Sequence, residues 1–392
     1  MIIVAVDIAK DKHDCLITNT DGEVLFKPFI IPNTLDGFEN LYAKIDSVAD
    51  FPQNVKVGLE ATGHYHLNLL GYLLNKGLPV ILINPLHTSL FRKSLSFRKT
   101  KTDVVDARAI ARLLMSDQTL QPYSLTSYQN EELKSLTRYR ADKVRERAKL
   151  KSSLRRLVVI LFPELETMVS SLHSKVVYDL LREFPGASHV ASAHLTRLAH
   201  LFSASSRGHY GKEDADRIRD AARRSIGTEF PAKSMELCHT IDLIRFMDKE
   251  IDEIETKIFA LLAQNPPKML GIQGMGPRMA AVIVAEVGDF NRFSSPDKLL
   301  AYAGLSPTTY QSGQLTSTYA KMEKRGSRYL RYALFNATKY ICVCDPTFQT
   351  YLAKKRAEGK HYNVAISHAA KKLVRLIYHL ETTGETYIPK AS

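Results

Sequence analysis

The sequence predicts an N-terminal α/β domain with a mixed sheet, then a coiled-coil helical region and a mainly helical C-terminal domain. The first 114 residues alternate short apolar runs with amphipathic stretches, as strands and helices in layers do. Apolar residues then recur at heptad spacing, and beyond residue 265 glycine turns separate basic helical stretches. A chain of 392 residues is too long for one core. We therefore expect three domains, at residues 1–128, 129–264 and 265–392.

The N-terminal elements begin with a strand in MIIVAVDIA, which ends near Asp7. Two apolar alternating runs follow on either side of Asp21-Gly22, a pair of residues typical of a hairpin turn. Thr34 is placed to cap a helix over residues 35–48. These features predict three strands followed by one helix.

The remaining N-terminal elements repeat a strand–helix unit. VKVGLEA predicts a strand and YHLNLLGYLLNKG a helix that ends at Gly77. PVILINP predicts a buried strand, Pro85 opens another helix, and KTKTDVVDARAIARLL supplies the last one. The predicted order is β-β-β-α-β-α-β-α, which gives a mixed sheet covered by helices.

Two long helices are expected in the middle of the chain, from Leu133 to Leu161 and around Leu237–Leu261, with chain breaks between them at Pro185-Gly186 and at residues 206–208. In the second helix apolar residues recur at strict sevens, as in a coiled coil. The pattern favours an antiparallel hairpin or a dimerisation arm, and two ordinary core helices remain the alternative. The residues at sevens are Leu237, Ile244, Ile251 and Ile258.

The composition of the chain indicates which kinds of binding partner to expect. The chain has 54 Lys and Arg against 41 Asp and Glu, a formal net charge of +13, which favours a polyanion partner over an ordinary basic enzyme. Four cysteines without metal-ligand spacing predict neither a zinc site nor a disulfide framework. The short apolar N-terminus and the lack of a membrane-length apolar run predict a cytoplasmic protein without a membrane partner.

Four acidic residues form the first candidate site. Asp103 and Asp106 are three residues apart, so on a helix they share one face, and a lysine, an arginine or a metal ion must offset their repulsion. Asp7 and Glu60 each end a predicted strand and would reach the same sheet edge. Four converging carboxylates suit hard divalent cations that support phosphoryl transfer. Alternatively, Asp103 caps its helix and Asp106 pairs with a nearby lysine or arginine.

A glycine-containing turn, GIQGMGPRMAA, predicts a helix-hairpin-helix in the C-terminal domain. Gly274 and Gly276 would let the backbone approach a nucleic-acid phosphate at a helix start. A plain packing joint between two helices is the alternative. A nucleotide-binding loop is not expected, because the stretch lacks the lysine of that motif.

A polar loop and a basic run follow. GLSPTTYQSGQ predicts a loop in which Gly313 leaves the Ser312 hydroxyl exposed, although most loop serines have no catalytic role. The next stretch interleaves tyrosines with cations that suit phosphate contacts, and a solvated basic helix is the alternative. The candidate nucleic-acid-binding residues in this run are Lys321, Lys324, Arg325, Arg328 and Arg331.

Four blocks of the sequence resemble one known family. VAVDIAKDKHD, GLEATGHYH, INPLHTSLFRKS and KTDVVDARAIA are similar to the N-terminal domain of the bridge-RNA-guided insertion-sequence transposases, which are DEDD-type recombinases with a RuvC-like RNase H fold. The resemblance covers nearly the whole chain and is looser at residues 165–235. It implies an RNase H-like N-terminal domain and a C-terminal transposase domain.

The resemblance also implies roles for individual residues. Asp7, Glu60, Asp103 and Asp106 match the tetrad that binds Mg²⁺ or Mn²⁺. Ser312 lies in a block that matches the nucleophilic serine, which attacks a DNA phosphate and forms a covalent protein–DNA intermediate. Because a long helical arm separates Ser312 from the tetrad, we hypothesise that the two meet across subunits of a dimer or tetramer.

The expected function is that of a site-specific recombinase that moves an insertion element. In the family a structured RNA encoded by the element pairs with donor and target DNA, so this guide RNA is an expected partner. One alternative is a metal-dependent endonuclease of branched DNA that does not use the serine. The other is a nucleic-acid-binding regulator without catalytic activity.

Overall fold

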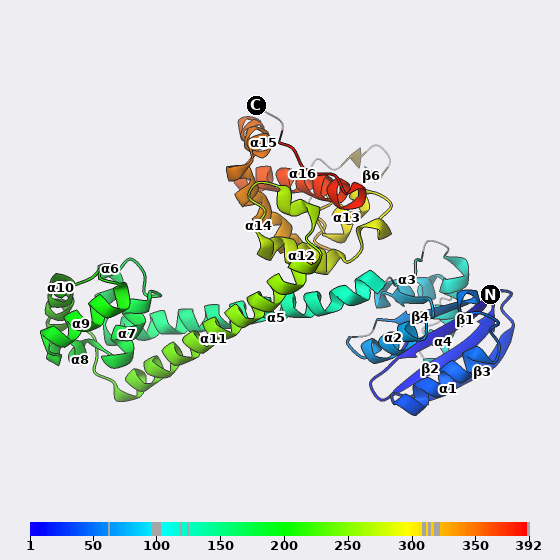
Figure 1. The fold of residues 1–392 in the computed structure, drawn as a ribbon, viewed down its shortest axis with the longest axis horizontal. Coiled ribbons are helices and arrows are strands. Elements are labelled where there is room, and N and C mark those ends of the chain that lie inside the picture. Colours follow the sequence, from blue (N-terminus) through cyan, green and yellow to red (C-terminus); the bar gives the residue numbers. More distant parts are fainter. Residues whose placement is uncertain are drawn as a thin grey trace. The chain divides into compact units, whose positions relative to one another are not determined.

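The computed structural model describes residues 1–61, 63–95, 103–117, 120–123, 125–307, 311–312, 315–316 and 322–389 (Figure 1). The chain divides into two compact units. One comprises Met1–Glu132 with Val287–Leu299, and the other comprises Leu133–Glu286 with Leu300–Ser392. The division into three domains at residues 128 and 264 stays a prediction.

The first unit contains a five-stranded mixed sheet in the order β3-β2-β1-β4-β5. The first three strands pair antiparallel, whereas β4 pairs parallel with β1 and β5 pairs parallel with β4. A helix precedes β4 and another precedes β5, as parallel connections require. The predicted order of strands and helices along the chain and the predicted mixed sheet are therefore confirmed. The strands are β1 (Ile2–Ile8), β2 (Lys12–Asn19), β3 (Val24–Pro32), β4 (Val55–Glu60) and β5 (Val80–Ile83).

Helices cover both faces of this sheet. Thr34 accepts a hydrogen bond from the Gly37 amide at 3.3 Å, so the predicted cap is confirmed. The buried residues of α1 and α2 share one core with Val4 and Val6 of β1, whereas those of α4 share another core with Ile3 and Ala5. The helical elements are α1 (Leu35–Asp46), η1 (Pro52–Asn54), α2 (His66–Asn75), α3 (Pro85–Leu95) and α4 (Asp103–Ser116).

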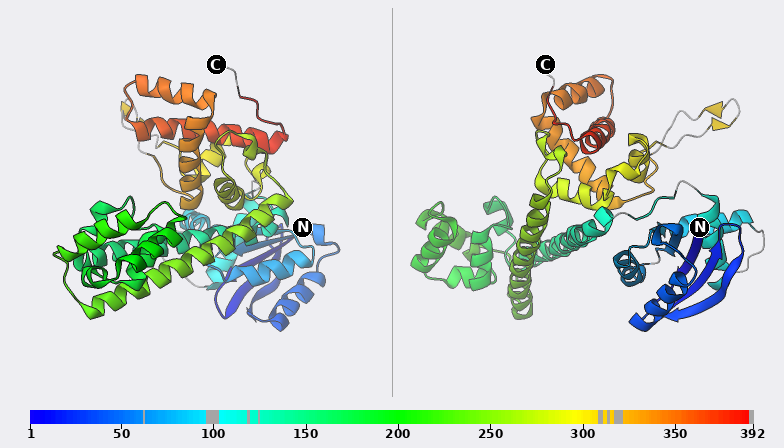
Figure 2. Two further views of the ribbon diagram at one scale, coloured as in Figure 1. Left: turned by 60° about the vertical axis from the view of Figure 1, so that its left-hand side comes forward. Right: turned by 45° about the vertical axis from the view of Figure 1, so that its right-hand side comes forward.

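Two long helices, α5 (Leu125–Leu161) and α11 (Pro231–Gln264), confirm the predicted helical stretches. Ion pairs join them in reverse order along the chain, so they run antiparallel (Figures 1 and 2). The coiled coil and the dimerisation arm themselves stay predictions. The pairs are Arg140–Glu255, Lys143–Glu250, Arg147–Asp248 and Arg156–Glu236.

Five short helices between α5 and α11 form a helical lobe, residues 162–230, around a core that includes Phe162 and Phe202. The predicted chain breaks are confirmed. Gly186 has φ +141° before α8, and Arg207 ends α9 in the left-handed region. The helices are α6 (Leu165–Met168), α7 (Lys175–Glu183), α8 (Ala187–Ser192), α9 (Leu195–Ser206) and α10 (Lys212–Arg223).

The C-terminal stretch is mainly helical, as predicted. A two-stranded pair, β6 (Gln311–Ser312) with β7 (Leu315–Thr316), lies where the sequence predicted only a loop. Of the described residues, none belongs to a helix long and apolar enough to cross a membrane. The remaining elements are η2 (Lys268–Gly271), α12 (Pro277–Val287), η3 (Phe290–Arg292), α13 (Pro296–Tyr302), α14 (Arg328–Cys344), α15 (Pro346–Ala357) and α16 (Tyr362–Thr383).

Buried carboxylates fix the helices of the second unit. Glu286 on α12 accepts hydrogen bonds from Arg138 Nε and Nη2 of α5, at 2.7 and 3.0 Å, and from Ser327 Oγ at 2.7 Å. Glu255 on α11 accepts from Arg140 and Arg278, each at 2.7 Å. A buried charge is tolerated only when it is paired and hydrogen-bonded, so these contacts stabilise one arrangement of the helices.

Candidate functional site

Asp7 and Glu60 lie next to each other at the carboxyl edge of the sheet. Val6 of β1 pairs with Leu59 of β4 in a parallel register, so the next residue of each strand, Asp7 and Glu60, also lie opposite each other. Both side chains are half-buried. The structure thus brings together two predicted site residues that are 53 positions apart in the sequence.

Both residues share the sheet face that α4 covers. Strand side chains alternate between faces, and Ala5, two residues before Asp7, contacts the α4 core. On β4, a Cβ placed on Gly58 would meet Leu114 Cδ1 at 2.6 Å, which puts Gly58, and hence Glu60, on the same face. Asp7 and Glu60 therefore direct their carboxylates toward α4.

The first turns of α4 lie toward the carboxyl edge. Beyond the end of α4, the Tyr123 amide donates to the Val80 carbonyl at the amino end of β5, so the helix runs back across the sheet. Asp106 lies eight residues before Leu114, a rise of about 12 Å toward the carboxyl edge. Asp106 is 7% exposed and follows Asp103, which begins the helix. The side chain of Asp103 lies outside the described residues.

Arg92 supplies a positive charge beside Asp106. Its guanidinium, on α3, forms an ion pair with Asp106. The alternative in which an arginine pairs with Asp106 is therefore observed in this structure. The sequence predicted a lysine or an arginine near Asp106 without indicating that it is Arg92.

Asp14 is an acidic residue that was not predicted as part of the site. It lies directly opposite Asp7 in the antiparallel β1–β2 pair, and it is 8% exposed. Lys12 Nζ lies 3.9 Å from Asp14 Oδ2. The signal was present in the sequence, because strands joined by a three-residue turn at residues 9–11 place positions 7 and 14 opposite each other.

The donor set suits a hard divalent cation, since carboxylate oxygens are its preferred ligands and at least Asp7, Glu60 and Asp106 belong to one side of the sheet. Among the described side chains, however, no three His, Cys, Asp or Glu groups come close enough to hold an ion together. Asp106 is instead paired with Arg92, and the side chain of Asp103 lies outside the described residues. Chemistry and backbone placement fit a cation, and the Arg92 contact opposes it.

An arginine–tyrosine cluster (Arg138, Arg145, Arg328 and Tyr329) forms the second candidate site. The guanidinium carbons of Arg138 and Arg328 lie 5.1 and 4.9 Å from the ring centre of Tyr329. Arg145 Nη2 lies 3.5 Å from the Tyr329 hydroxyl. The hydrogen bond to Glu286 raises the pKa of Arg138 above its ordinary value. Cations around an aromatic ring suit phosphates and stacked bases.

The other predicted basic residues differ in their surroundings. Lys324 and Arg325 are exposed, and Arg325 lies 3.6 Å from Glu323. Arg331 instead donates to backbone carbonyls of Ala303 and Lys324, at 3.4 and 3.2 Å, so its contacts are structural. Lys321 lies outside the described residues.

Gly274 and Gly276 occupy different environments in the predicted helix-hairpin-helix. Gly274 has φ +91°, and a Cβ there would lie 2.9 Å from the Tyr340 carbonyl oxygen of α14. This close approach explains the glycine by packing. A Cβ on Gly276 would have open space around it. The element before the hairpin, η2, is a four-residue 3-10 turn, and the helix-hairpin-helix stays a prediction.

Ser312 ends β6 and pairs with Leu315 of β7. Residues 313 and 314, which connect the two strands, lie outside the described residues, as does the Ser312 side chain. The backbone thus places Ser312 beside a two-residue connection, and its proposed role as nucleophile stays a prediction.

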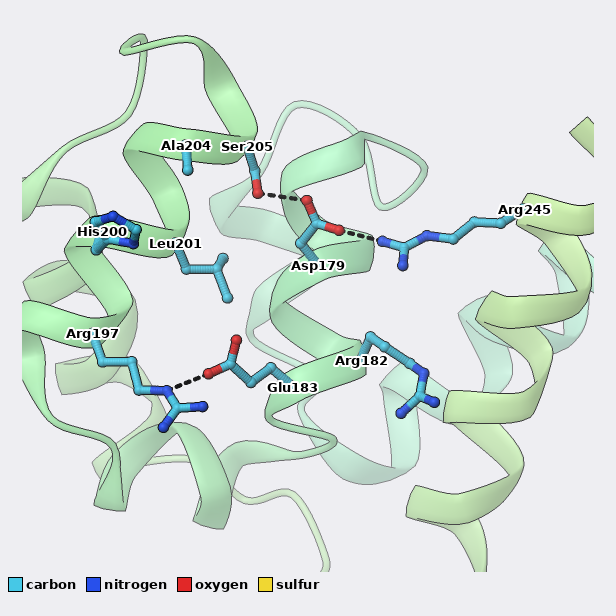
Figure 3. Close-up of a pocket in the computed structure, with 9 residues that line it drawn as sticks. All are labelled: Asp179, Arg182, Glu183, Arg197, His200, Leu201, Ala204, Ser205 and Arg245. Atoms are coloured by element: carbon cyan, nitrogen blue, oxygen red, sulfur yellow. Dashed lines mark hydrogen bonds and ion pairs between the residues drawn. The ribbon is translucent and has the colours of Figure 1, made fainter. Parts of the chain in front are cut away.

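A pocket of about 470 Å³ lies away from all these residues in sequence, between α7, α9 and α11 (Figure 3). Its cations are already compensated: Asp179 pairs with Arg245 and accepts from Ser205 Oγ at 2.5 Å, and Glu183 pairs with Arg197. No residue pattern in the sequence predicted a site in this lobe.

Comparison with similar proteins identifies the class of enzyme to which this fold and these residues belong. A family model described as Transposase, of the DEDD type, matches residues 4–163, and one described as Transposase IS116/IS110/IS902 family matches residues 268–353. The chain is a DNA transposase or recombinase. It belongs to the IS116/IS110/IS902 family of transposases.

Individual relatives agree with this assignment over nearly their whole length. The chain is 25% identical to the insertion element IS116 uncharacterized 44.8 kDa protein of Streptomyces clavuligerus, across 99% of this chain and 96% of that protein. It is 22% identical to the mini-circle putative transposase for IS117 of Streptomyces coelicolor, across 98% and 95%. It is 23% identical to the pilin gene-inverting protein of Moraxella lacunata, across 96% and 94%. The DEDD type also indicates use of a divalent metal.

Proposed function

We propose that this transposase cuts and joins DNA strands of an insertion element through a covalent intermediate on Ser312, with Mg²⁺ or Mn²⁺ held by Asp7, Glu60, Asp103 and Asp106. The observation that carries the proposal is the placement of Asp7 beside Glu60 on the face covered by α4, where Asp106 lies. The substrate group at such a carboxylate site is a DNA phosphate, which the bound cation would contact.

The serine, the carboxylates and the basic residues have separate roles in the proposed reaction. The Ser312 hydroxyl attacks phosphorus, so an Oγ–P bond forms, a bridging P–O bond breaks, and the hydroxyl proton passes to the departing strand through solvent. When bound, the divalent cation supplies charge stabilisation for the phosphate and for the departing oxygen. The four carboxylates fix its position. Arg328, Arg145 and the other exposed cations hold the DNA backbone.

Two partners belong to the same proposal. A guide RNA encoded by the element pairs with donor and target DNA, which leaves backbone and shape for the protein to recognise. The protein acts as a homo-oligomer, a dimer or a tetramer. The net charge of +13 and the arginine–tyrosine cluster support a nucleic-acid partner.

A covalent-adduct assay tests the proposal. Protein, Mg²⁺, an element-end DNA junction and the flanking RNA are mixed and denatured, and DNA-linked peptides are identified by mass spectrometry. We expect DNA on Ser312, lost in Ser312→Ala and in Asp103→Asn and retained in the control Ser306→Ala. Cleavage that survives Ser312→Ala without any adduct would instead establish a metal-dependent endonuclease.

A further inference from the structure

Arg92 contacts one of the four proposed metal ligands. Its Nη1 donates to Asp106 Oδ1, which connects α3 to α4. The Asp106 side chain is 9% exposed and the Arg92 side chain 27%. The carboxylate is therefore enclosed by protein, whereas the guanidinium keeps access to solvent.

The charges around this contact explain why an arginine occupies it. Asp7, Asp14 and Glu60 stand on three adjacent strands of the same sheet, and Asp106 is on the helix that covers their face. Carboxylates gathered on one partly buried face destabilise each other in the absence of a cation. The Arg92 guanidinium supplies one positive charge there, with a charge-assisted hydrogen bond.

A divalent cation held by the Asp106 carboxylate would lie next to the Arg92 guanidinium, because Arg92 donates to Oδ1 of the same group. A guanidinium and a divalent cation repel each other strongly at contact distance in a medium of low polarity. Each of the two positive charges therefore weakens the binding of the other to the Asp106 carboxylate. The exposed side of Arg92 gives it a path toward solvent when it leaves.

We propose that Arg92 is a positioning residue that competes with the divalent cation for Asp106. It neutralises Asp106 in the cation-free protein and releases it when the cation binds. The inference rests on the proposed metal-assisted cleavage and adds to it a built-in competitor that sets the cation concentration at which the site fills. An ion pair that merely joins α3 to α4 would contribute to stability and leave cation affinity unchanged.

The test is equilibrium Mn²⁺ binding to the full chain, followed by the electron paramagnetic resonance signal of free Mn²⁺. We expect Arg92→Ala to bind Mn²⁺ about tenfold more tightly than the wild type, since one charge-assisted contact no longer has to be broken. Arg92→Lys keeps the positive charge and should stay close to the wild type. Arg112→Ala, which removes an exposed arginine of α4, should leave the affinity unchanged.

Asp7→Asn separates this inference from the proposed metal site. Weaker Mn²⁺ binding in Asp7→Asn, with equal affinity in Arg92→Ala and the wild type, would overturn the role of Arg92 and retain the site. Mn²⁺ binding that Asp7→Asn leaves unchanged would overturn both. Circular dichroism shows whether each variant is folded, and Arg92→Gln replaces Arg92→Ala if the alanine variant loses its helical signal.

Discussion

Asp106 in the first unit and Glu286 in the second are both buried acids that meet an arginine from another helix, yet their compensation differs. Glu286 receives a bidentate contact from Arg138 and a hydroxyl contact from Ser327. Asp106 has an ion pair with Arg92, on a sheet face that also carries Asp7. A carboxylate with several donors holds helices together, whereas one that depends on a displaceable arginine is suited to exchange its partner.

Removing the charge at each position would test this difference most severely. We expect Glu286→Gln to lower the free energy of unfolding by about 2 kcal/mol, because it removes a fully buried carboxylate that accepts hydrogen bonds from Arg138 and Ser327. Asp106→Asn should cost less than about 1 kcal/mol, because the loss of one ion pair is offset by weaker repulsion from the other carboxylates on that sheet face. Chemical denaturation followed by circular dichroism measures both. Equal losses would contradict the distinction between the two carboxylates.

Acid stability gives a second, smaller difference. Burial raises the pKa of Glu255, but the hydrogen bonds from Arg278 and Arg140 outweigh it, so the pKa lies below its ordinary value. A carboxyl whose pKa is lowered in the folded state stabilises the protein above its unfolded pKa of about 4.3, and this contribution disappears as pH falls through the folded pKa.

We therefore expect the stability advantage of the wild type over Glu255→Gln to be constant between about pH 6 and 7 and to shrink below about pH 4. Denaturation curves recorded at each pH measure the advantage. An advantage that grows on acidification would show that the Glu255 pKa is raised instead.

The smallest expected effect concerns DNA affinity. Each lysine or arginine that contacts a phosphate contributes about 0.9 to the slope of log affinity against log salt. Replacing Arg145 and Arg328 together by glutamine should reduce this slope by about 1.8 for a short duplex, measured by fluorescence anisotropy. Lys249→Gln, an exposed change on α11, should leave it unaltered. An unaltered slope in the double variant would remove the arginine–tyrosine cluster from the DNA interface.

What the sequence predicted depended on short-range patterns. Asp7 and Glu60 were predicted to share an edge because each ends an apolar strand, and parallel strands align their carboxyl ends. The contact between Arg92 and Asp106 was not identified, because nothing in the spacing of two helices shows which side chains face each other. Arg138 was missed for the same reason, since its partners Glu286 and Tyr329 lie more than a hundred residues away.

Glycine patterns predicted where turns lie but not why a turn needs a glycine. The turn at Gly274 was predicted correctly, yet its close approach to Tyr340 provides a packing reason that no local pattern contains. Ser312 was expected in an open loop and lies at the end of a short strand. A two-residue strand buries too little to leave a periodic signal in the sequence.

The helical lobe enters and leaves the long helices at one place. The Thr228 amide donates to the Ile160 carbonyl at 2.9 Å, and the Ile226 amide donates to Glu164 at 3.0 Å, so the two ends of the lobe are hydrogen-bonded to each other. The α5–α11 ion pairs lie outside this junction. The chain therefore enters and leaves the lobe side by side, while the Asp179–Arg245 and Arg182–Asp242 ion pairs also hold α7 of the lobe against α11. A longer or shorter lobe would leave these two adjacent points of entry and exit unchanged.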